Sequence, residues 1–159
     1  GLGRQPRRFV TSITGVRPAA ARESDRQTAL PASLLGSVGA DGRVEPPVNV
    51  DYGYNIQSSD EFIANVGCVF FGGAQLSFGT NCLLGLGAHV YAADRAAGLG
   101  RADPVTVGDD VWVGDRAVPA PGVTVGDRAV VEAGSVVVND VPVDTLVSGN
   151  PAERIRGLD

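Results

Sequence analysis

The chain of 159 residues contains no methionine and no lysine, a single histidine and only two cysteines. Cys68 and Cys82 lie among apolar neighbours without a Cys-x-x-Cys spacing, which argues against a disulfide framework or a zinc site and favours core or wall positions. The apolar stretches are short and are interrupted by glycine or aspartate, so no membrane-spanning helix is predicted. Residues 1–10 show no secretory signal. We therefore expect a cytoplasmic protein with no bound metal and no membrane partner.

Positive charge is concentrated at the start of the chain. Residues 1–43 contain seven arginines and three acidic residues, the other 116 residues contain six arginines and fifteen acidic residues, and these local charges of +4 and −9 give the net charge of −5. The basic segment lacks interleaved aromatic residues and any nucleic-acid-binding motif, so nucleic acid is not expected as a partner. We predict an arm over residues 1–47, helical in part over 19–35, that packs on the acidic body or on a neighbouring subunit. The second domain is predicted over residues 48–159.

The body of the chain carries an apolar residue at every sixth position in runs separated by interruptions, and glycine or an acid often follows it. The positions in this series are Ala64, Phe70, Phe78, Leu84, Val90, Val107, Val113, Val125, Val131 and Val137, with Pro119 in the remaining late slot. A strict short period of branched residues with glycines is typical of a parallel β-helix, in which each repeat turns one side chain inward and needs a small residue at its corner. Three hexapeptides form one rung, so residues 58–142 predict an all-β fold with about four rungs.

A coil of this kind has flat outer faces that need to be covered. Stretches such as Val136-Val137-Val138 would leave more apolar surface exposed than a monomer usually keeps in water. Association around an axis parallel to the coil covers such faces, and a closed ring avoids filaments. We therefore expect an oligomer with binding sites in polar clefts between its subunits.

Motifs across residues 44–156 resemble the hexapeptide-repeat O-acetyltransferases of the maltose and galactoside acetyltransferase type. The matching stretches, in the order of that family, are Glu45-Pro46-Pro47, Asp51–Asn55, Ala64-Asn65, Val105–Gly114, Pro121–Gly126 and Ser148–Ala152. The resemblance implies a left-handed β-helix, a homotrimer, and a cleft between subunits in which acetyl-CoA meets a sugar hydroxyl. It also implies a histidine base, an acid that orients the histidine, and an asparagine or backbone donor for the oxyanion.

The chain departs from this family at five positions of the implied site. Arg95 stands in place of the histidine base, and arginine cannot deprotonate an alcohol near neutral pH because its pKa exceeds about 12. Gly98–Gly100 replaces the segment with the orienting acid, and Gly72 replaces an acceptor-binding aspartate. Asn139 and Glu153 stand where basic residues would meet CoA phosphates, and a glutamate there repels them.

Four residues are candidates for catalysis. His89 is the only imidazole, and because its direction alternates with that of the inward Val90 we expect it to face outward, where it is either a base or a structural interface residue. Asp94 and Arg95 lie in the loop 92–103, where a desolvated carboxylate could move protons and a guanidinium could stabilise a carboxylate or enolate. The resemblance adds Asn65 as the oxyanion donor.

Five further residues are candidates for substrate binding. Arg101 lies in the same loop as Asp94 and adds a second cation for an anionic substrate. The resemblance implies that Asp51, Tyr52 and Tyr54 face the acceptor, although the aspartate is also a common turn cap. It implies that Trp112 walls the CoA channel, and a tryptophan outside the coil also packs as plain apolar surface.

Three functions remain open on this basis. Because five departures fall at one cleft, we predict an enzyme that acts on a small organic substrate between subunits without CoA or another cofactor, in an isomerase-, cyclase- or dehydratase-like reaction. The first alternative is an acetyl-CoA-dependent O-acetyltransferase in which His89 or Asp94 is the substitute base. The second alternative is a non-catalytic trimeric binding module.

Overall fold

The computed structural model describes residues 10–13, 34–92 and 102–159, with side chains from residue 34 onward. The helix predicted over 19–35 lies almost wholly outside these ranges, as do the loop candidates Asp94, Arg95 and Arg101. Within them, Leu34 is helical, a single 3-10 turn, η1, spans Gly53–Asn55, and all other regular structure is β. No helix of the described chain is long and apolar enough to cross a membrane.

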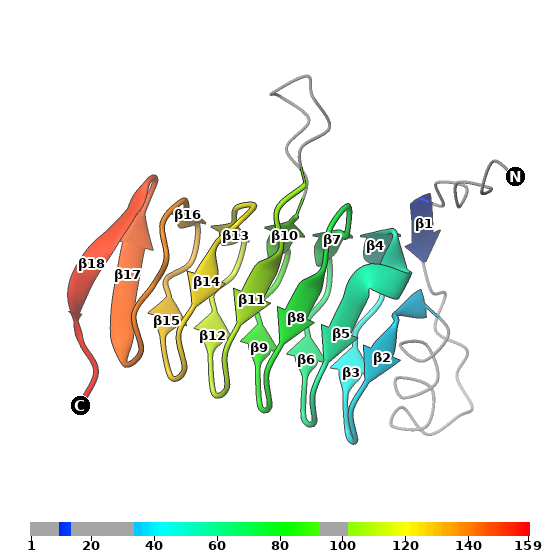
Figure 1. The fold of residues 1–159 in the computed structure, drawn as a ribbon, viewed down its shortest axis with the longest axis horizontal. Coiled ribbons are helices and arrows are strands. Elements are labelled where there is room, and N and C mark those ends of the chain that lie inside the picture. The colour runs from blue at the N-terminus through cyan, green and yellow to red at the C-terminus, as the bar shows by residue number, and fades with distance from the viewer. Residues whose placement is uncertain (1–9, 14–33, 93–101) are drawn as a thin grey trace, which may run out of the picture.

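Short strands follow one another along a single coil (Figure 1). These strands are β1 (Val10–Ile13), β2 (Ser37–Val38), β3 (Arg43–Val44), β4 (Val48–Asp51), β5 (Ile56–Ser58), β6 (Ile63–Ala64), β7 (Val69–Phe71), β8 (Leu76–Phe78), β9 (Leu83–Leu84), β10 (His89–Tyr91), β11 (Val105–Val107), β12 (Trp112–Val113), β13 (Val118–Pro119), β14 (Thr124–Val125), β15 (Val130–Val131), β16 (Val136–Val137), β17 (Thr145–Gly149) and β18 (Ala152–Gly157).

Strands one rung apart lie side by side and run parallel, which makes three faces. Face A contains β4, β7, β10, β13 and β16, face B contains β2, β5, β8, β11 and β14, and face C contains β3, β6, β9, β12, β15 and β17. Two antiparallel strands close the ends, because β1 pairs with β4 and β18 pairs with β17. The predicted all-β parallel β-helix is confirmed. Its sheets begin with β2 and β3, so Ser37–Val44 belongs to the first rung.

The six-residue series forms the core of the coil. Ala64, Leu84, Val113 and Val131 are fully buried on face C, and the other members of the series are also buried, on faces A and B. A second residue stands two positions before each of them, as Val111 stands before Val113; it is also buried, and it is apolar in every case except Ser135. The coil therefore receives two inward side chains from each hexapeptide.

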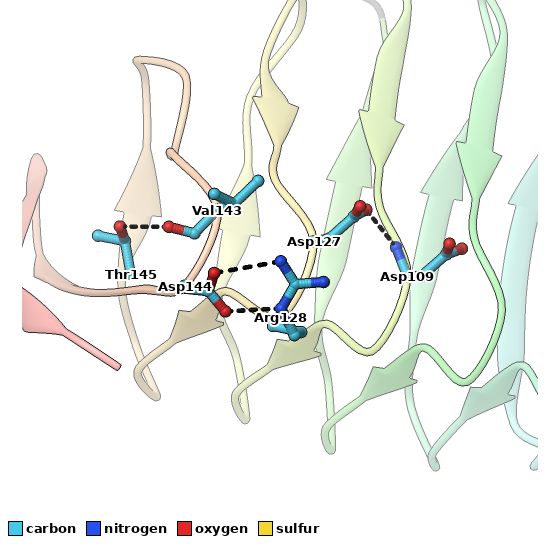
Figure 2. A network of polar contacts seen from close by, with 6 residues as sticks. All are labelled: Asp109, Asp127, Arg128, Val143, Asp144 and Thr145. Atoms are coloured by element: carbon cyan, nitrogen blue, oxygen red, sulfur yellow. Dashed lines mark hydrogen bonds and ion pairs between the residues drawn. The ribbon is translucent and has the colours of Figure 1, made fainter. Parts of the chain in front are cut away.

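Aspartates at the corner between faces B and C tie each rung to the one before it. Asp109 Oδ1 accepts the Thr80 N–H at 2.8 Å, and Asp127 Oδ1 accepts the Asp109 N–H at 2.8 Å. A Cβ added to Gly108 would lie 2.2 Å from Asp127 Oδ1, so the Gly-Asp pairs of the sequence reflect this close approach. Figure 2 shows the Asp109–Asp127 contact beside the ion pair of Arg128 and Asp144, 2.6 Å long.

Both cysteines are free and buried, as the sequence predicts. Burial raises the pKa of Cys68 to about 12 and that of Cys82 to about 11. Only the thiolate is nucleophilic, so we expect neither thiol to react in the native protein at pH 8. Titration with an aromatic disulfide reagent should find no reactive thiol before denaturation and two after it. Rapid reaction of either thiol in the native protein would contradict its burial.

The three faces differ in what they present outward. The outward residues of face B are polar and lie in register as Gln57, Ser77, Thr106 and Thr124. The outward residues of face C are mostly apolar and lie in register as Arg43, Ile63, Leu83, Trp112, Val130, Leu146 and Arg156. Face A presents the apolar Val69, Phe71, Val118 and Val136 outward, beside the polar Asn49, Asp51, His89 and Tyr91. Two of the three faces therefore carry the surface for which the sequence predicts a partner.

Candidate active site

The sequence candidates on face A gather around β10. Strand alternation turns Val90 into the core and His89 outward, as predicted, and Tyr91 points outward two residues later. The parallel register places Phe71 beside Tyr91, and the two rings stack with centroids 4.8 Å apart and planes 18° from parallel. His89 Nδ1 makes a hydrogen bond with Tyr91 Oη. A half-buried imidazole is thus joined to a stacked phenol on the outside of the coil.

Partial burial shifts the titration of this pair in opposite directions. Desolvation lowers the pKa of His89 below 6.5 and raises the pKa of Tyr91 above 10. At neutral pH the imidazole is therefore uncharged and the phenol keeps its proton. A neutral imidazole has one unprotonated ring nitrogen, which is the chemical requirement for a general base.

Asp51 ends β4 in the same outward row as Phe71 and Tyr91, and it is only 3% exposed. Tyr52 follows in the left-handed region with φ of 54°, and its ring meets that of Tyr54 edge-on with centroids 6.0 Å apart. Tyr54 is 53% exposed. The chain therefore places two phenols and one buried carboxylate at the corner between faces A and B.

Gly72, which stands where the resemblance expects an acceptor-binding aspartate, lies against this corner. A Cβ at Gly72 would be 2.8 Å from the Tyr52 carbonyl oxygen and 3.1 Å from that of Asp51. The Asn55 side chain also donates to the Gly72 carbonyl at 2.7 Å. Because the backbone approaches so closely, any side chain at position 72 would force the corner apart, which is a physical reason for the glycine.

Asn65 lies at another corner, between faces C and A. Its Oδ1 accepts the Val66 N–H at 2.8 Å, and its backbone N–H donates to the Leu84 carbonyl. The amide group therefore has a fixed orientation, and Nδ2 donates to no other residue in the described ranges. A half-buried amide donor of this kind can stabilise a developing oxyanion.

Trp112 stands on face C in the middle of the outward apolar row and is 53% exposed. Val130 and Leu146 follow it strand by strand, and Arg156 of β18 stands beside Leu146. Within the described chain, no carboxylate pairs with the Arg156 guanidinium. The row is thus an apolar track about 14 Å long, three strand spacings, that ends on an exposed cation.

In one protomer the structure brings only some of the sequence candidates together. His89 and Asp51 share face A, Tyr52 and Tyr54 lie at its outer corner, Asn65 lies at its other corner, and Trp112 lies on face C. Asp94, Arg95 and Arg101 fall outside the described residues and stay predictions. No group of three or more His, Cys, Asp or Glu side chains in the described ranges is arranged to hold a metal ion.

The sequence interpretation missed Tyr91 and Phe71 as site residues. Two signals were available. Tyr91 follows His89 by two residues, which is the period of a strand, so both side chains point the same way. Phe71 and Tyr91 are 20 residues apart, as are the paired residues Val69 and His89. The place of Arg156 could not be derived in the same way, because β18 runs antiparallel and carries a register shift near Leu146 and Val147.

Comparison with known proteins places this geometry in a family. The model of the hexapeptide repeat of succinyl-transferase matches residues 104–138. A putative acetyltransferase of Saccharomyces cerevisiae is 37% identical over 143 residues, which are 86% of this chain and 73% of that protein. The chain belongs to the hexapeptide-repeat acetyltransferases.

Two solved structures of this family share most of the fold. A hexapeptide-repeat-containing acetyltransferase from Vibrio cholerae O1 biovar eltor, complexed with acetyl coenzyme A, is 36% identical with a TM-score of 0.81, over 89% of this chain and 80% of that one. A galactoside acetyltransferase in complex with coenzyme A is 30% identical with a TM-score of 0.82, over 91% of this chain and 74% of that one.

These complexes correct two predictions made from the sequence. The prediction of a CoA-independent isomerase, cyclase or dehydratase-like enzyme is wrong, and so is the prediction of no cofactor, because related acetyltransferases bind acetyl-CoA or CoA on the same fold. The error arose because the prediction considered single positions where an expected cation is absent, such as Asn139 and Glu153, and did not consider the rest of the binding surface. The outward row from Trp112 to Arg156 is visible only when the strands are in register.

Proposed function

We propose that this protein is an acetyl-CoA-dependent O-acetyltransferase that acts as a homotrimer on a hydroxyl group of a small molecule. The observation that carries the proposal is the apolar row of face C that ends on Arg156, in a chain whose relatives are complexed with acetyl-CoA and CoA. The apolar side chains of this row can pack against an extended pantetheine arm, and the Arg156 guanidinium can bind the phosphates at the far end of that arm. The buried free thiols suit a reducing cytoplasm.

The distribution of polarity over the three faces supports a closed trimer. In a ring made by rotation, one face of each protomer meets a different face of the next. Face C is mostly apolar outside and face A carries outward apolar residues such as Phe71 and Val118 beside its polar ones. The outward residues of face B are all polar, so A meets C and B faces solvent. Three such contacts close the ring and place the corner with Asn65 toward the axis.

The same contact completes the active site from two protomers. Rotation about an axis parallel to the coil keeps each residue at its own height along the axis. β10 ends the third rung, so His89 and Tyr91 of one protomer lie opposite Leu83 and Trp112 of the neighbouring subunit. Acetyl-CoA then lies along face C of one protomer, and the acceptor hydroxyl binds against face A of the other. Asn65 donates to the oxyanion, and Asp51, Tyr52 and Tyr54 border the acceptor at the open side of the cleft.

The proposed function is tested by acetyl transfer from acetyl-CoA to a panel of sugars and other polyhydroxyl compounds. The expected result is free CoA thiol and O-acetylated product in equal amounts, with no thiol release when the acceptor is omitted. The buried thiols of the protein do not disturb a thiol assay. Absence of transfer to every acceptor, with intact folded protein, would contradict the proposal.

Arg156 offers a test of where the phosphates bind. Arg156→Glu is expected to weaken acetyl-CoA binding at least tenfold, because loss of a charge-assisted contact and gain of repulsion together exceed about 1.4 kcal/mol. The affinity for acetyl-pantetheine, which lacks the nucleotide phosphates, should change little. The matched control is Arg43→Glu, at the other end of the same outward row. Equal effects of the two substitutions on acetyl-CoA affinity would contradict this placement.

A further inference from the structure

The hydrogen bond between His89 and Tyr91 gives the two ring nitrogens of the only imidazole in the chain different partners. Nδ1 faces the Tyr91 hydroxyl, so Nε2 is the nitrogen left for another partner. A phenol oxygen can accept a hydrogen bond, and when Nδ1–H donates to it, Nε2 carries the lone pair. The direction of this hydrogen bond therefore decides which ring nitrogen carries the proton, and its partner is the residue two positions further along the same strand.

The surroundings hold the tyrosine in place. Its ring stacks on Phe71, with centroids 4.8 Å apart, and meets the His89 ring at 62° with centroids 5.5 Å apart. Backbone pairing of β10 with β7 fixes both strands, and the His89 N–H donates to the Ala117 carbonyl on the next rung. A rigid support of this kind keeps the phenol oxygen where Nδ1 needs it.

We propose that His89 is the general base of the acetyl transfer and that Tyr91 is its positioning residue, an inference that rests on the function proposed above. His89 Nε2 takes the proton of the acceptor hydroxyl while the hydroxyl oxygen attacks the thioester carbonyl carbon. The new C–O bond forms and the C–S bond breaks through a tetrahedral oxyanion. The proton on Nε2 then passes to the departing thiolate, which leaves free CoA, an acetyl ester and a neutral imidazole.

The elements packed against β10 carry few groups that compete for this role. β7 presents Val69 and Phe71 beside the pair, and β13 follows on the other side with Val118. In the described ranges, the charged groups near these elements are Asp51, two strands away in the row of Tyr91, and two residues that precede β13. Of these two, Arg116 lies near Gly87, and Asp115 Oδ1 accepts the Leu86 N–H at 2.9 Å. Burial lowers the pKa of His89, so the imidazole is neutral and basic at pH 7.

The tautomer can be measured without any substrate. Because His89 is the only histidine, untagged protein labelled with ring-¹⁵N histidine gives the signals of one imidazole. Above the pKa of the ring we expect the proton on Nδ1 and an unprotonated Nε2, and in Tyr91→Phe we expect the proton to move to Nε2. Thr106→Val, which removes a hydroxyl from face B, should leave the tautomer unchanged. A wild-type ring protonated on Nε2, or one indifferent to Tyr91→Phe, overturns the positioning role.

Kinetics then test the base itself. His89→Asn is expected to lower kcat by about 10²- to 10⁴-fold while the affinity for acetyl-CoA stays within threefold. Tyr91→Phe should lower kcat about tenfold with little change in KM for acetyl-CoA. In the wild type, kcat/KM should rise with pH through an apparent pKa below 6.5, and this limb should vanish in His89→Asn.

The outcomes separate this inference from the proposed function. Acetyl transfer that survives both His89→Asn and His89→Gln overturns the assignment of the base while the acetyltransferase function stands. Wild-type protein that binds no acetyl-CoA overturns the proposed function, and the base with it. Loss of kcat in the variants with wild-type acetyl-CoA affinity supports both.

Discussion

Replacing Ile63 with arginine is expected to split the proposed trimer into monomers. Ile63 stands in the outward row of face C, 36% exposed in the single chain, between Arg43 and Leu83. In the proposed ring this position is covered by face A of the neighbour. An unpaired guanidinium buried there costs several kcal/mol for each of three equivalent contacts. Since the proposed active site is built from two protomers, acetyl transfer should fall together with the fraction of trimer.

The matched control for this substitution is Gln57→Arg. Gln57 lies on β5 of the same rung, but it points outward from the polar face B. Light scattering after gel filtration should give about 49 kDa for the wild type and for Gln57→Arg, three times the chain mass of 16.3 kDa, and a monomer for Ile63→Arg. A trimer that persists in Ile63→Arg but dissociates in Gln57→Arg would place the interface on face B and contradict the ring.

The second large effect is expected from Phe62→Ala in the core. Phe62 is fully buried, and its ring lies 4.8 Å from that of Phe78, which in turn meets Phe70 edge-on at 5.9 Å. Truncation to alanine removes the transfer free energy of the ring and leaves a cavity that a closed coil cannot collapse. We expect the free energy of unfolding to fall by about 3–5 kcal/mol. Domains have about 5–15 kcal/mol in total, so the variant should be near the limit of stability.

Urea unfolding followed by circular dichroism measures this loss. All samples need the same protein concentration, because the stability of an oligomer depends on it. The control is Tyr54→Ala, which removes an aromatic side chain that is already 53% exposed and should change the free energy of unfolding by no more than about 0.5 kcal/mol. Equal midpoints for Phe62→Ala and the wild type would contradict the packed core of this rung.

The regular part of the fold could be predicted from the sequence because its signal repeats. The apolar series from Ala64 to Val137 predicts which side chains enter the core, and each of them is buried in the structure. The outward direction of His89 followed from the same alternation. The limits of the coil were harder to predict, because Ser37–Val44 does not continue the six-residue apolar series. This segment joins the first rung through its pairing with β5 and β6.

The site was predictable only in its parts. Positions such as Asn65 and Trp112 could be named from the resemblance, but whether a surface binds CoA depends on residues far apart in sequence. Arg156 meets Leu146 through an antiparallel strand, and Trp112 meets Val130 across one rung. The register that joins them is a tertiary property. For this reason the departures at Asn139 and Glu153 led to the wrong cofactor prediction.

The measurement that tests the central claim most directly is a calorimetric titration of the purified protein with acetyl-CoA, with free CoA as the comparison. If acetyl-CoA is the donor and lies along face C, it should bind at micromolar concentration with one site per chain. Arg156→Glu should reduce that affinity and Arg43→Glu should not. Absence of heat at millimolar acetyl-CoA, with the protein folded and trimeric, would remove the acyl donor and contradict the account.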